Sequence, residues 1–331
     1  MTITKLTDVL WTPLVTTTGI SAASPALFIF DSTHYFALNN TQDQGGAVTL
    51  NMKRSADAGA TWSDSLVDAQ HMAIDAAGRL WAYTREAANT YKIYYSDDWG
   101  VNWTLSYTPP AGVKHSFFLA CHPTNRNVIA LWATDASSHP VFVTTADRGT
   151  SWTVTTPSGT RPDTFLDSVQ YQYGFRVLQS GRYVVSGFFT TGPKGGVMTS
   201  DDSGVTWTAR QTDAANSYLR YGLGGSVSGA KLATVVNAAN SAYPWVSIDS
   251  GTTWAVLALS QSLQAFTGDA TITVRAMVYD QTRDAMYVST NNAGFTVVKL
   301  TPVSDSGVWS NLKFNIPTSA PVNSGMAVIP A

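Results

Sequence analysis

The sequence predicts an all-β fold, and two observations carry this prediction. The first is composition: Glu86 is the only glutamate among 22 acidic residues, and good helix formers are scarce, while Thr, Val, Tyr, Trp, Ser, Asn and Gly are plentiful. The second is a short acidic pattern that returns along the 331 residues, each time between apolar stretches. Together they indicate strands joined by tight turns in a repeated unit.

The recurring pattern reads Ser/Thr-x-Asp-x-Gly-x-Thr/Ser/Asn-Trp, and its copies follow one another at intervals of roughly 50 residues. A worn copy, Val303–Trp309, keeps Asp305 and Gly307 and has one residue fewer before the tryptophan. The well-kept copies are Ser55–Trp62, Ser96–Trp103, Thr145–Trp152, Ser200–Trp207 and Ser247–Trp254.

The chemistry of the pattern is that of a tight hairpin turn. The aspartate carboxylate can accept hydrogen bonds from backbone N–H groups of the turn, and the Ser or Thr hydroxyl can tie its other end. Glycine supplies a positive φ that other residues resist. The tryptophan ring can then cover the turn and enter the gap between neighbouring sheets.

This pattern resembles the Asp-box, or BNR, repeat of sialidases and related β-propellers, over about residues 50–310. The resemblance implies that each box lies between the third and fourth strands of a propeller blade, on the face away from the ligand site. It implies a structural role for Asp57, Asp98, Asp147, Asp202, Asp249 and Asp305, and for Trp62, Trp103, Trp152, Trp207, Trp254 and Trp309.

Each unit holds four strand signals, which suits a four-stranded propeller blade. In the unit around the second box these are residues 71–78, 79–86, 91–100 and 101–108. Six such units account for residues 21 to 314. We interpret residues 1–15, which contain Trp11, and residues 324–331 as a seventh blade built from both chain ends, which closes the ring and removes open sheet edges. Six blades is the alternative, and the sialidase precedent favours it. We expect residues 1–331 to form one propeller domain.

A ligand is expected on the face opposite the boxes, where three long linkers of successive blades should form one lobe. These are residues 155–168, 209–222 and 258–273. Aromatic side chains beside Arg and Asp suit contact with a sugar or a protein. The alternative is that the long loops simply pack on each other. The candidate ligand-binding residues are Arg161, Asp163, Phe165, Asp213, Tyr218, Arg220 and Phe266.

His71 and His115 occupy the same place in adjacent units, just before the expected innermost strand. Both are candidates to line the mouth of the central channel. Two imidazoles can share a metal, but no third ligand is evident, and polar lining is the commoner role. We therefore expect no metal and no cofactor.

The sialidase resemblance implies an arginine triad, a tyrosine nucleophile paired with a glutamate, and an aspartic acid/base. No arginine precedes Arg54, and Glu86 comes too early in the chain to fit the order of the family. The set is incomplete, so no catalytic residue is assigned. Other box-bearing glycosidases use paired aspartates, and Asp163, Asp167 and Asp213 leave that alternative open.

Charge and apolar content limit the classes of partner that the chain is expected to bind. Charged residues make up 13% of the chain and the net charge is −2, so nothing favours nucleic acid or an anionic membrane. No apolar run is long enough to span a bilayer, and the N-terminus has no signal-peptide pattern. Cys121, the only cysteine, cannot form an intrachain disulfide and is expected to be a small buried residue.

The leading hypothesis is a non-enzymatic binding or structural propeller. Low Lys and Glu, high Thr, Ser, Ala and Asn, and a propeller that starts without an export signal resemble bacteriophage virion proteins. This implies a tail or surface component, in the virion or outside the cell after lysis, that docks to virion proteins or binds a host-surface glycan as receptor. A glycoside hydrolase and a cytoplasmic assembly factor are the alternatives, and a homo-oligomer is left open.

Overall fold

The computed structural model of this chain is built from β-strands. It describes residues 25–39, 51–86, 90–110, 112–135, 137, 139–159, 162–163, 174–189, 195–213, 218–219, 223–226, 228–238, 241–256, 265–266, 268, 274–280, 285–290, 297–301 and 308–312. Within these ranges the strands form six antiparallel sheets that follow one another along the chain.

The first three sheets have four strands each, paired in chain order. Sheet one consists of β1 (Pro25–Ile29), β2 (Tyr35–Asn39), β3 (Asn51–Ser55) and β4 (Ser63–Val67). Sheet two consists of β5 (Ala69–Ile74), β6 (Leu80–Glu86), β7 (Thr90–Ser96) and β8 (Thr104–Tyr107). Sheet three consists of β9 (Val113–Cys121), β10 (Ile129–Asp135), β11 (Pro140–Thr145) and β12 (Thr153–Thr155).

Sheets four and five each have five strands, and sheet six has four. Sheet four consists of β13 (Pro162–Asp163), β14 (Gly174–Val177), β15 (Tyr183–Phe189), β16 (Gly195–Ser200) and β17 (Thr208–Asp213). Sheet five consists of β18 (Tyr218–Leu219), β19 (Gly224–Gly225), β20 (Leu232–Ala238), β21 (Ser241–Ser247) and β22 (Ala255–Val256). Sheet six consists of β23 (Val274–Asp280), β24 (Ala285–Thr290), β25 (Val297–Thr301) and β26 (Val308–Leu312).

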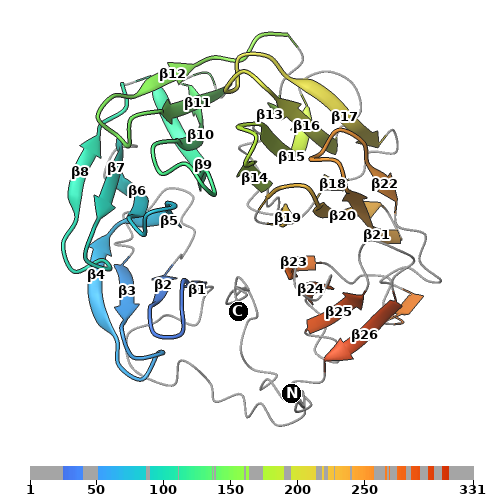
Figure 1. The fold of residues 1–331 in the computed structure, drawn as a ribbon, viewed down its shortest axis with the longest axis horizontal. Helices are drawn as coiled ribbons and strands as arrows, with labels where there is room; N and C mark the ends of the chain where they lie inside the picture. Colours follow the sequence, from blue (N-terminus) through green and yellow to red (C-terminus); the bar gives the residue numbers. More distant parts are fainter. Residues whose placement is uncertain are drawn as a thin grey trace.

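The sheets stand around a common centre like the blades of a propeller (Figure 1). The first strand of each sheet lies towards the centre and the last lies at the rim. This radial repetition of antiparallel sheets is the β-propeller architecture. The expected units from residue 21 to 314 therefore correspond to sheets one to six. The proposed seventh blade, residues 1–15 and 324–331, lies outside the described residues.

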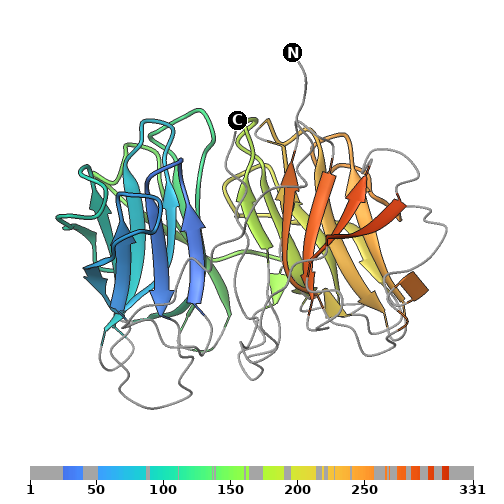
Figure 2. The ribbon, with the colours of Figure 1, turned by 90° about the horizontal axis from the view of Figure 1, so that it is seen from below.

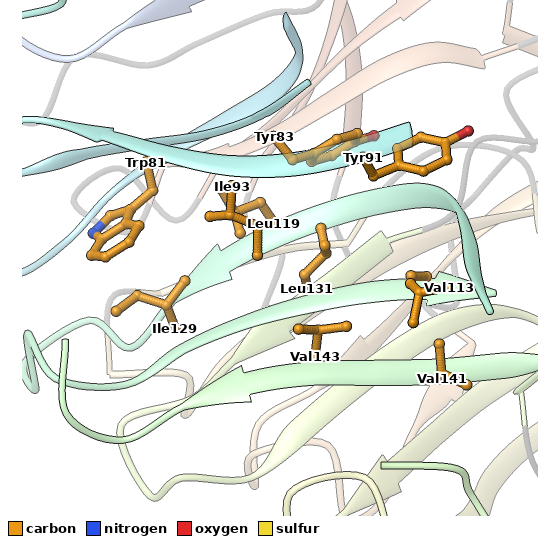
Figure 3. Close-up of a cluster of buried hydrophobic side chains, with 11 residues drawn as sticks. Trp81, Tyr83, Tyr91, Ile93, Val113, Leu119, Ile129, Leu131, Val141 and Val143 are labelled. Atoms are coloured by element: carbon orange, nitrogen blue, oxygen red, sulfur yellow. The ribbon is translucent and has the colours of Figure 1, made fainter. Parts of the chain in front are cut away.

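The core lies in the gaps between neighbouring sheets, and the alternation of side chains along β6 shows how it forms. Trp81 and Tyr83 face sheet three, where they join Leu131 in one buried cluster (Figure 3). Leu80 and Ala82, on the opposite face of the same strand, join a cluster with Phe36 and Met52 of sheet one. Because sheets two, three and four are each covered on both faces, their middle strands read as nearly continuous apolar runs.

Cys121 was expected to be a small buried residue, and the structure differs in part. It ends β9 and packs beside the cluster between sheets two and three, but it keeps partial exposure. Burial of its sulfur still raises the pKa of the thiol well above its usual value. The side chain is therefore a half-buried packing residue that is a poor nucleophile at neutral pH.

Candidate functional site

The antiparallel strand order divides the connections of the chain between two faces of the ring (Figure 2). First-to-second and third-to-fourth connections lie at one face, which we call the turn face. Second-to-third connections and the links to the next sheet lie at the other, which we call the linker face. The acidic turns follow β3, β7, β11, β16 and β21, so they all lie at the turn face.

Hydrogen bonds close each acidic turn, and the turn after β16 shows the full set. Ser200 Oγ donates to Asp202 Oδ1 over 2.7 Å and accepts from the Gly204 amide over 2.8 Å. Thr206 donates to Asp202 twice, from its amide over 2.9 Å and from Oγ1 over 2.5 Å. The same bonds recur in the turns around Asp57, Asp98, Asp147 and Asp249. Each carboxylate is engaged within its own turn. Asp305 lies outside the described residues.

These bonds hold the turn carboxylates in the ionised form. The Thr61 hydroxyl and amide hold the pKa of Asp57 at about 2, and Asn102 and Ser151 do the same for Asp98 and Asp147. For Asp202 and Asp249, partial burial works to raise the pKa, but hydrogen bonds to the carboxylate outweigh it and the pKa is lowered. At neutral pH such carboxylates can accept hydrogen bonds but have no proton to donate.

Each turn places two successive residues at positive φ, at the fourth position of the pattern and at the glycine. Such a pair is the signature of a type I′ turn, whose twist matches that of the flanking strands. Only the glycine was expected to be left-handed, because the fourth position shows no consistent residue type. The pairs are Ala58–Gly59, Trp99–Gly100, Arg148–Gly149, Ser203–Gly204 and Ser250–Gly251.

The turns also contact the preceding sheet. A Cβ placed on Gly149 would lie 2.6 Å from Ser106 Oγ and 2.7 Å from the Trp81 ring, both of sheet two. Trp152 of the same turn donates its indole N–H to Ser106 Oγ over 3.2 Å. Glycine is therefore needed here for close approach as well as for φ. Trp103 bonds Ser65 of the preceding sheet in the same way, whereas Trp62, Trp207 and Trp254 donate to the glycine carbonyl of their own turn. Trp309 lies in β26, and its turn lies outside the described residues.

The linker face is built differently: in sheets two to six, the innermost strand breaks register near its linker-face end. In sheet two, Ala69 and His71 pair with the consecutive residues Thr84 and Tyr83, which leaves Gln70 as an extra residue. Shifts of the same kind leave His115 and Phe117 extra in β9. In sheet six, Arg275 is extra in β23. Bulges of this kind redirect side chains and are common beside binding and active sites.

In sheets four and five the same irregularity is larger, and the innermost strand is in two pieces. β13 pairs with Phe188 and Phe189 of β15, whereas β14 pairs with residues 183–186 of the same strand. Likewise β18 and β19 pair with different parts of β20. The two split strands are joined by the guanidinium of Arg176, which donates to the carbonyls of Gly225 and Ser226 over 3.0 and 3.3 Å. Burial lowers the pKa of Arg176 to about 10, so it remains charged at neutral pH.

Three candidate ligand-binding residues were expected in loops, and the structure places them in strands instead. Asp163 lies in β13, Asp213 ends β17 and Tyr218 begins β18. The linkers extend the sheets because their backbone groups complete ladders with β15, β16 and β20. All three residues lie at linker-face ends of strands, and β18 lies beside β15, the strand with which β13 pairs.

The two histidines are also placed differently from the expectation, because they lie within the innermost strands β5 and β9 rather than before them. The His71 ring packs between Tyr83, at 6.4 Å, and Phe118 of the next sheet, at 5.5 Å. Its Nδ1 is buried, although the residue keeps some exposed surface. Burial lowers the pKa of His71 to about 4, so the ring is neutral at pH 7. His115 is one of the extra residues of β9.

The structure says less about the remaining candidate ligand-binding residues. Phe266 has a helical backbone conformation and is half-buried. Arg161, Phe165 and Arg220 lie outside the described residues. Among the side chains that the structure describes, no three His, Cys, Asp or Glu residues gather as a metal site requires. No helix in the described part of the chain is long and apolar enough to cross a membrane.

Sequence reasoning missed the extra residues Gln70 and Arg275. A polar residue inside a short apolar stretch is a weak signal, because alternation alone would place it on one face of the strand. It also missed a pocket between sheets one and two, because that pocket depends on residues from two repeats.

No protein family and no curated protein matches the chain by sequence. Solved structures do resemble it. A GH74 xyloglucanase from Xanthomonas campestris matches with a TM-score of 0.57 and 14% identity over 86% of this chain. The chain spans about half, 46%, of that enzyme.

Two further structures match with TM-scores of 0.47. An α-L-arabinofuranosidase from Fusarium graminearum is 14% identical over 87% of this chain and 91% of its own length. A Hadza microbial sialidase is 15% identical over 87% of this chain and 65% of its own. At such low identity the xyloglucanase likeness shows the fold, and together with the ring of antiparallel sheets it establishes that the chain is a β-propeller.

Proposed function

We propose that this chain is a non-enzymatic, carbohydrate-binding β-propeller that holds its ligand at the linker-face ends of its innermost strands. One observation carries the proposal: five consecutive sheets, two to six, lose strand register at this same end. A bulge weakens a strand ladder, so its return at one level around a ring indicates that the level serves something other than stability.

The residue types at this level support a glycan. Gln70, His115 and Arg275 are the extra residues of their strands, and each carries hydrogen-bonding groups that suit sugar hydroxyls. The segments of Asp163 and Tyr218 add a carboxylate and a phenol at the same level. The likeness of the fold to a xyloglucanase agrees with a polysaccharide or oligosaccharide ligand.

The absence of catalysis is the second part of the proposal. Of the three aspartates that leave a paired-aspartate glycosidase open, Asp167 lies outside the described residues, and Asp163 and Asp213 lie at the linker face of one sheet. Their strands are the two edges of the order β13-β15-β16-β17, and the pairings Asp163–Phe188 and Gly195–Asp213 put them on nearly the same row. Three strand spacings separate their backbones by about 14 Å. Glycosidase carboxylates lie roughly 5 to 9.5 Å apart, so this pair is poorly placed for catalysis.

The setting that we propose is the surface of a phage particle, as a tail or surface component outside the cell after lysis. The composition of the chain supports it, with 13% charged residues and a single glutamate. Its partners would be other virion proteins or a host-surface glycan. We further propose that both chain ends complete a seventh blade. Mass spectrometry of purified particles would test the setting, and absence of the chain from them would remove it.

A glycan array followed by calorimetry tests the binding function. We expect one glycan class to bind and Arg275→Ala to weaken it, since Arg275 is the extra residue of β23. Arg126→Ala is the matched control, because Arg126 is an exposed arginine in the β9–β10 turn at the opposite face. Equal effects of the two variants, or binding to no glycan, would contradict the proposal.

The runner-up function is a glycoside hydrolase, and turnover of chromogenic glycosides or polysaccharides separates it from binding. Turnover that disappears in Asp163→Asn or Asp213→Asn would establish the hydrolase. Binding without turnover in the unmodified protein is the result that we expect.

A further inference from the structure

A pocket of about 400 Å³ opens between sheets one and two, and no part of the proposed linker-face site uses it. Ser65, Leu66 and Asp68 line it from the last strand of sheet one and the residue that follows it. Thr84, Asn102 and Trp103 line it from sheet two. The volume lies at the lower end of the range typical of small-ligand sites.

One wall of the pocket is an indole ring that is held in place. Trp103 Nε1 donates to Ser65 Oγ over 2.9 Å, and Ser65 Oγ donates to the Gly100 carbonyl over 2.6 Å. These bonds run between the two sheets and fix the orientation of the ring. Trp103 keeps partial exposure and packs at the edge of the apolar cluster that contains Phe36 and Met52. The exposed part of a fixed indole is a suitable surface for the apolar face of a ligand.

The next junction shows why this pocket exists. Between sheets two and three, Trp152 makes the equivalent bond to Ser106, and Tyr107 stacks on its ring at 5.6 Å and 21°. Leu66 is the counterpart of Tyr107 in sheet one, since each follows the serine that the tryptophan bonds. Leu66 has no ring to stack on Trp103, so this junction lacks the stacking partner that Tyr107 provides one junction further on.

A second difference between the junctions lies on the middle strands. Thr84 of β6 and Ala133 of β10 both stand four residues after the start of their strand. Ala133 packs into the apolar cluster between sheets two and three. Thr84 is 1% exposed, and its Oγ1 has no hydrogen-bond partner in the part of the chain that the structure describes. The pocket wall thus contains the Thr84 hydroxyl, a hydrogen-bonding group that the described protein leaves unused. The equivalent position between sheets two and three, Ala133, has no such group.

We propose that this pocket binds a neutral sugar residue, with the C–H face of the pyranose ring on Trp103. The acceptors beside the indole suit sugar hydroxyls: they are the Asp68 carboxylate and Asn102 Oδ1, since the Asn102 amide group already donates to Asp98. No Lys, Arg or His is among the described lining residues, whereas the carboxyl group of Asp68 is among them. An acidic sugar such as N-acetylneuraminic acid is therefore disfavoured.

The indole N–H signal of Trp103 in a proton–nitrogen NMR spectrum provides the test. The probes are the methyl glycosides of glucose, galactose, mannose and N-acetylglucosamine, with N-acetylneuraminic acid as the charged comparison. At least one neutral glycoside should shift the signal in a saturable way, and the acid should not. No saturable shift at tens of millimolar neutral glycoside, or a stronger response to the acid, would overturn the proposal.

Leu66→Tyr is the decisive variant, because it copies the covered junction between sheets two and three. It should weaken the binding about tenfold or more without lowering the melting temperature. If the tyrosine is poorly accommodated, Thr84→Val removes the unused hydroxyl at nearly constant volume and should weaken binding in a fully folded protein. Unchanged affinity in both variants would overturn the proposal. Arg275→Ala should leave this binding intact, so failure here and failure of the linker-face site can be told apart.

Discussion

The guanidinium of Arg148 binds the carboxylate of Asp75 across the junction between sheets two and three, with Nε 2.9 Å from Oδ2. Asp75 lies in the β5–β6 turn, and its side chain has no exposed surface. The same carboxylate accepts the amides of Ala77 and Arg79 over 2.8 and 3.1 Å. Arg148 stands at the fourth position of its acidic turn, with φ of 60°. A position that varies from copy to copy thus ties two sheets together.

We predict that Arg148→Ala lowers the free energy of unfolding by about 1 to 3 kcal/mol. The reason is that the Asp75 carboxyl group stays buried with one hydrogen-bonding partner fewer, although its bonds to backbone amides limit the loss. Urea unfolding measures this. Asp201→Asn, which removes an ion pair between Arg182 and a 61% exposed carboxylate, should cost less than about 1 kcal/mol. Equal costs for the two variants would show that the Asp75 pair behaves as a surface pair.

A second prediction compares two glycines that share a φ of 84°. Gly78 has no atom within 4 Å of the place of a Cβ, whereas Gly149 has Ser106 Oγ at 2.6 Å and Trp81 at 2.7 Å. Gly78→Ala should lower the free energy of unfolding only through the strained backbone conformation, by about 1 kcal/mol. Gly149→Ala must also push two sheets apart, and we expect it to cost at least about 3 kcal/mol. Thermal unfolding of both variants measures the difference, and similar melting temperatures would mean that the sheets are not packed this closely.

A third prediction concerns His71, whose pKa is lowered to about 4 by burial between two aromatic rings. The unfolded chain binds a proton near pH 6.5 and the folded protein does not, so the stability that this group governs is complete above pH 6.5. It should fall by roughly 2 to 3 kcal/mol as the pH drops from 6.5 to 4. His71→Gln should flatten this decline in urea unfolding. His122, whose pKa burial also lowers, leaves a smaller residual slope. A ring signal of His71 that titrates near pH 6.5 in the folded protein would contradict the prediction.

The acidic turns could be placed from the sequence because the hydrogen bonds that close each turn lie within eight residues. Ser96–Trp103 sits between β7 and β8 as the pattern indicates, and the Asp98 bonds reach only four residues along the chain. The ring of sheets follows from the repetition of such hairpins. By contrast, the positive φ of the fourth turn position has no residue signature, since that position is tryptophan in this copy and arginine in the next.

The linker face could not be read from the sequence in the same way. The split of the innermost strand in sheet four depends on pairing with β15, which follows β13 by about 20 residues and competes with loop packing. The surroundings of Trp152 and Trp103 differ because Tyr107 stacks on the first indole and Leu66 stands at the equivalent position beside the second, and both of these residues belong to other repeats. Such differences arise from packing between repeats, and a pattern within one repeat does not contain them.

The last prediction concerns acid unfolding, which the turns should control. Hydrogen bonds hold the pKa values of Asp98 and Asp147 at about 2 in the folded protein, against 3.8 for an ordinary aspartate. A depressed carboxyl pKa contributes stability that is complete above the unfolded value and is lost as the pH falls through the folded value. Because five described turns share this chemistry, their losses should coincide between pH 4 and pH 2 and give a steep acid transition. Above pH 5 these groups should not change the midpoint of urea unfolding as the pH is varied. Below pH 4 we expect the midpoint to drop steeply.

Single variants separate this mechanism from general charge repulsion at low pH. Asp98→Asn and Asp147→Asn should each lower the melting temperature by a few degrees at pH 6 and reduce the drop between pH 4 and pH 2, because an amide cannot accept from both donors of the turn. Asp201→Asn serves as the control, since that carboxylate binds the Arg182 side chain. It should leave the steep part of the acid transition in place. If all three variants shift the acid transition equally, net charge governs it; a smaller drop in the turn variants alone means that the sheets come apart in acid because their hairpins lose the bonds that close them.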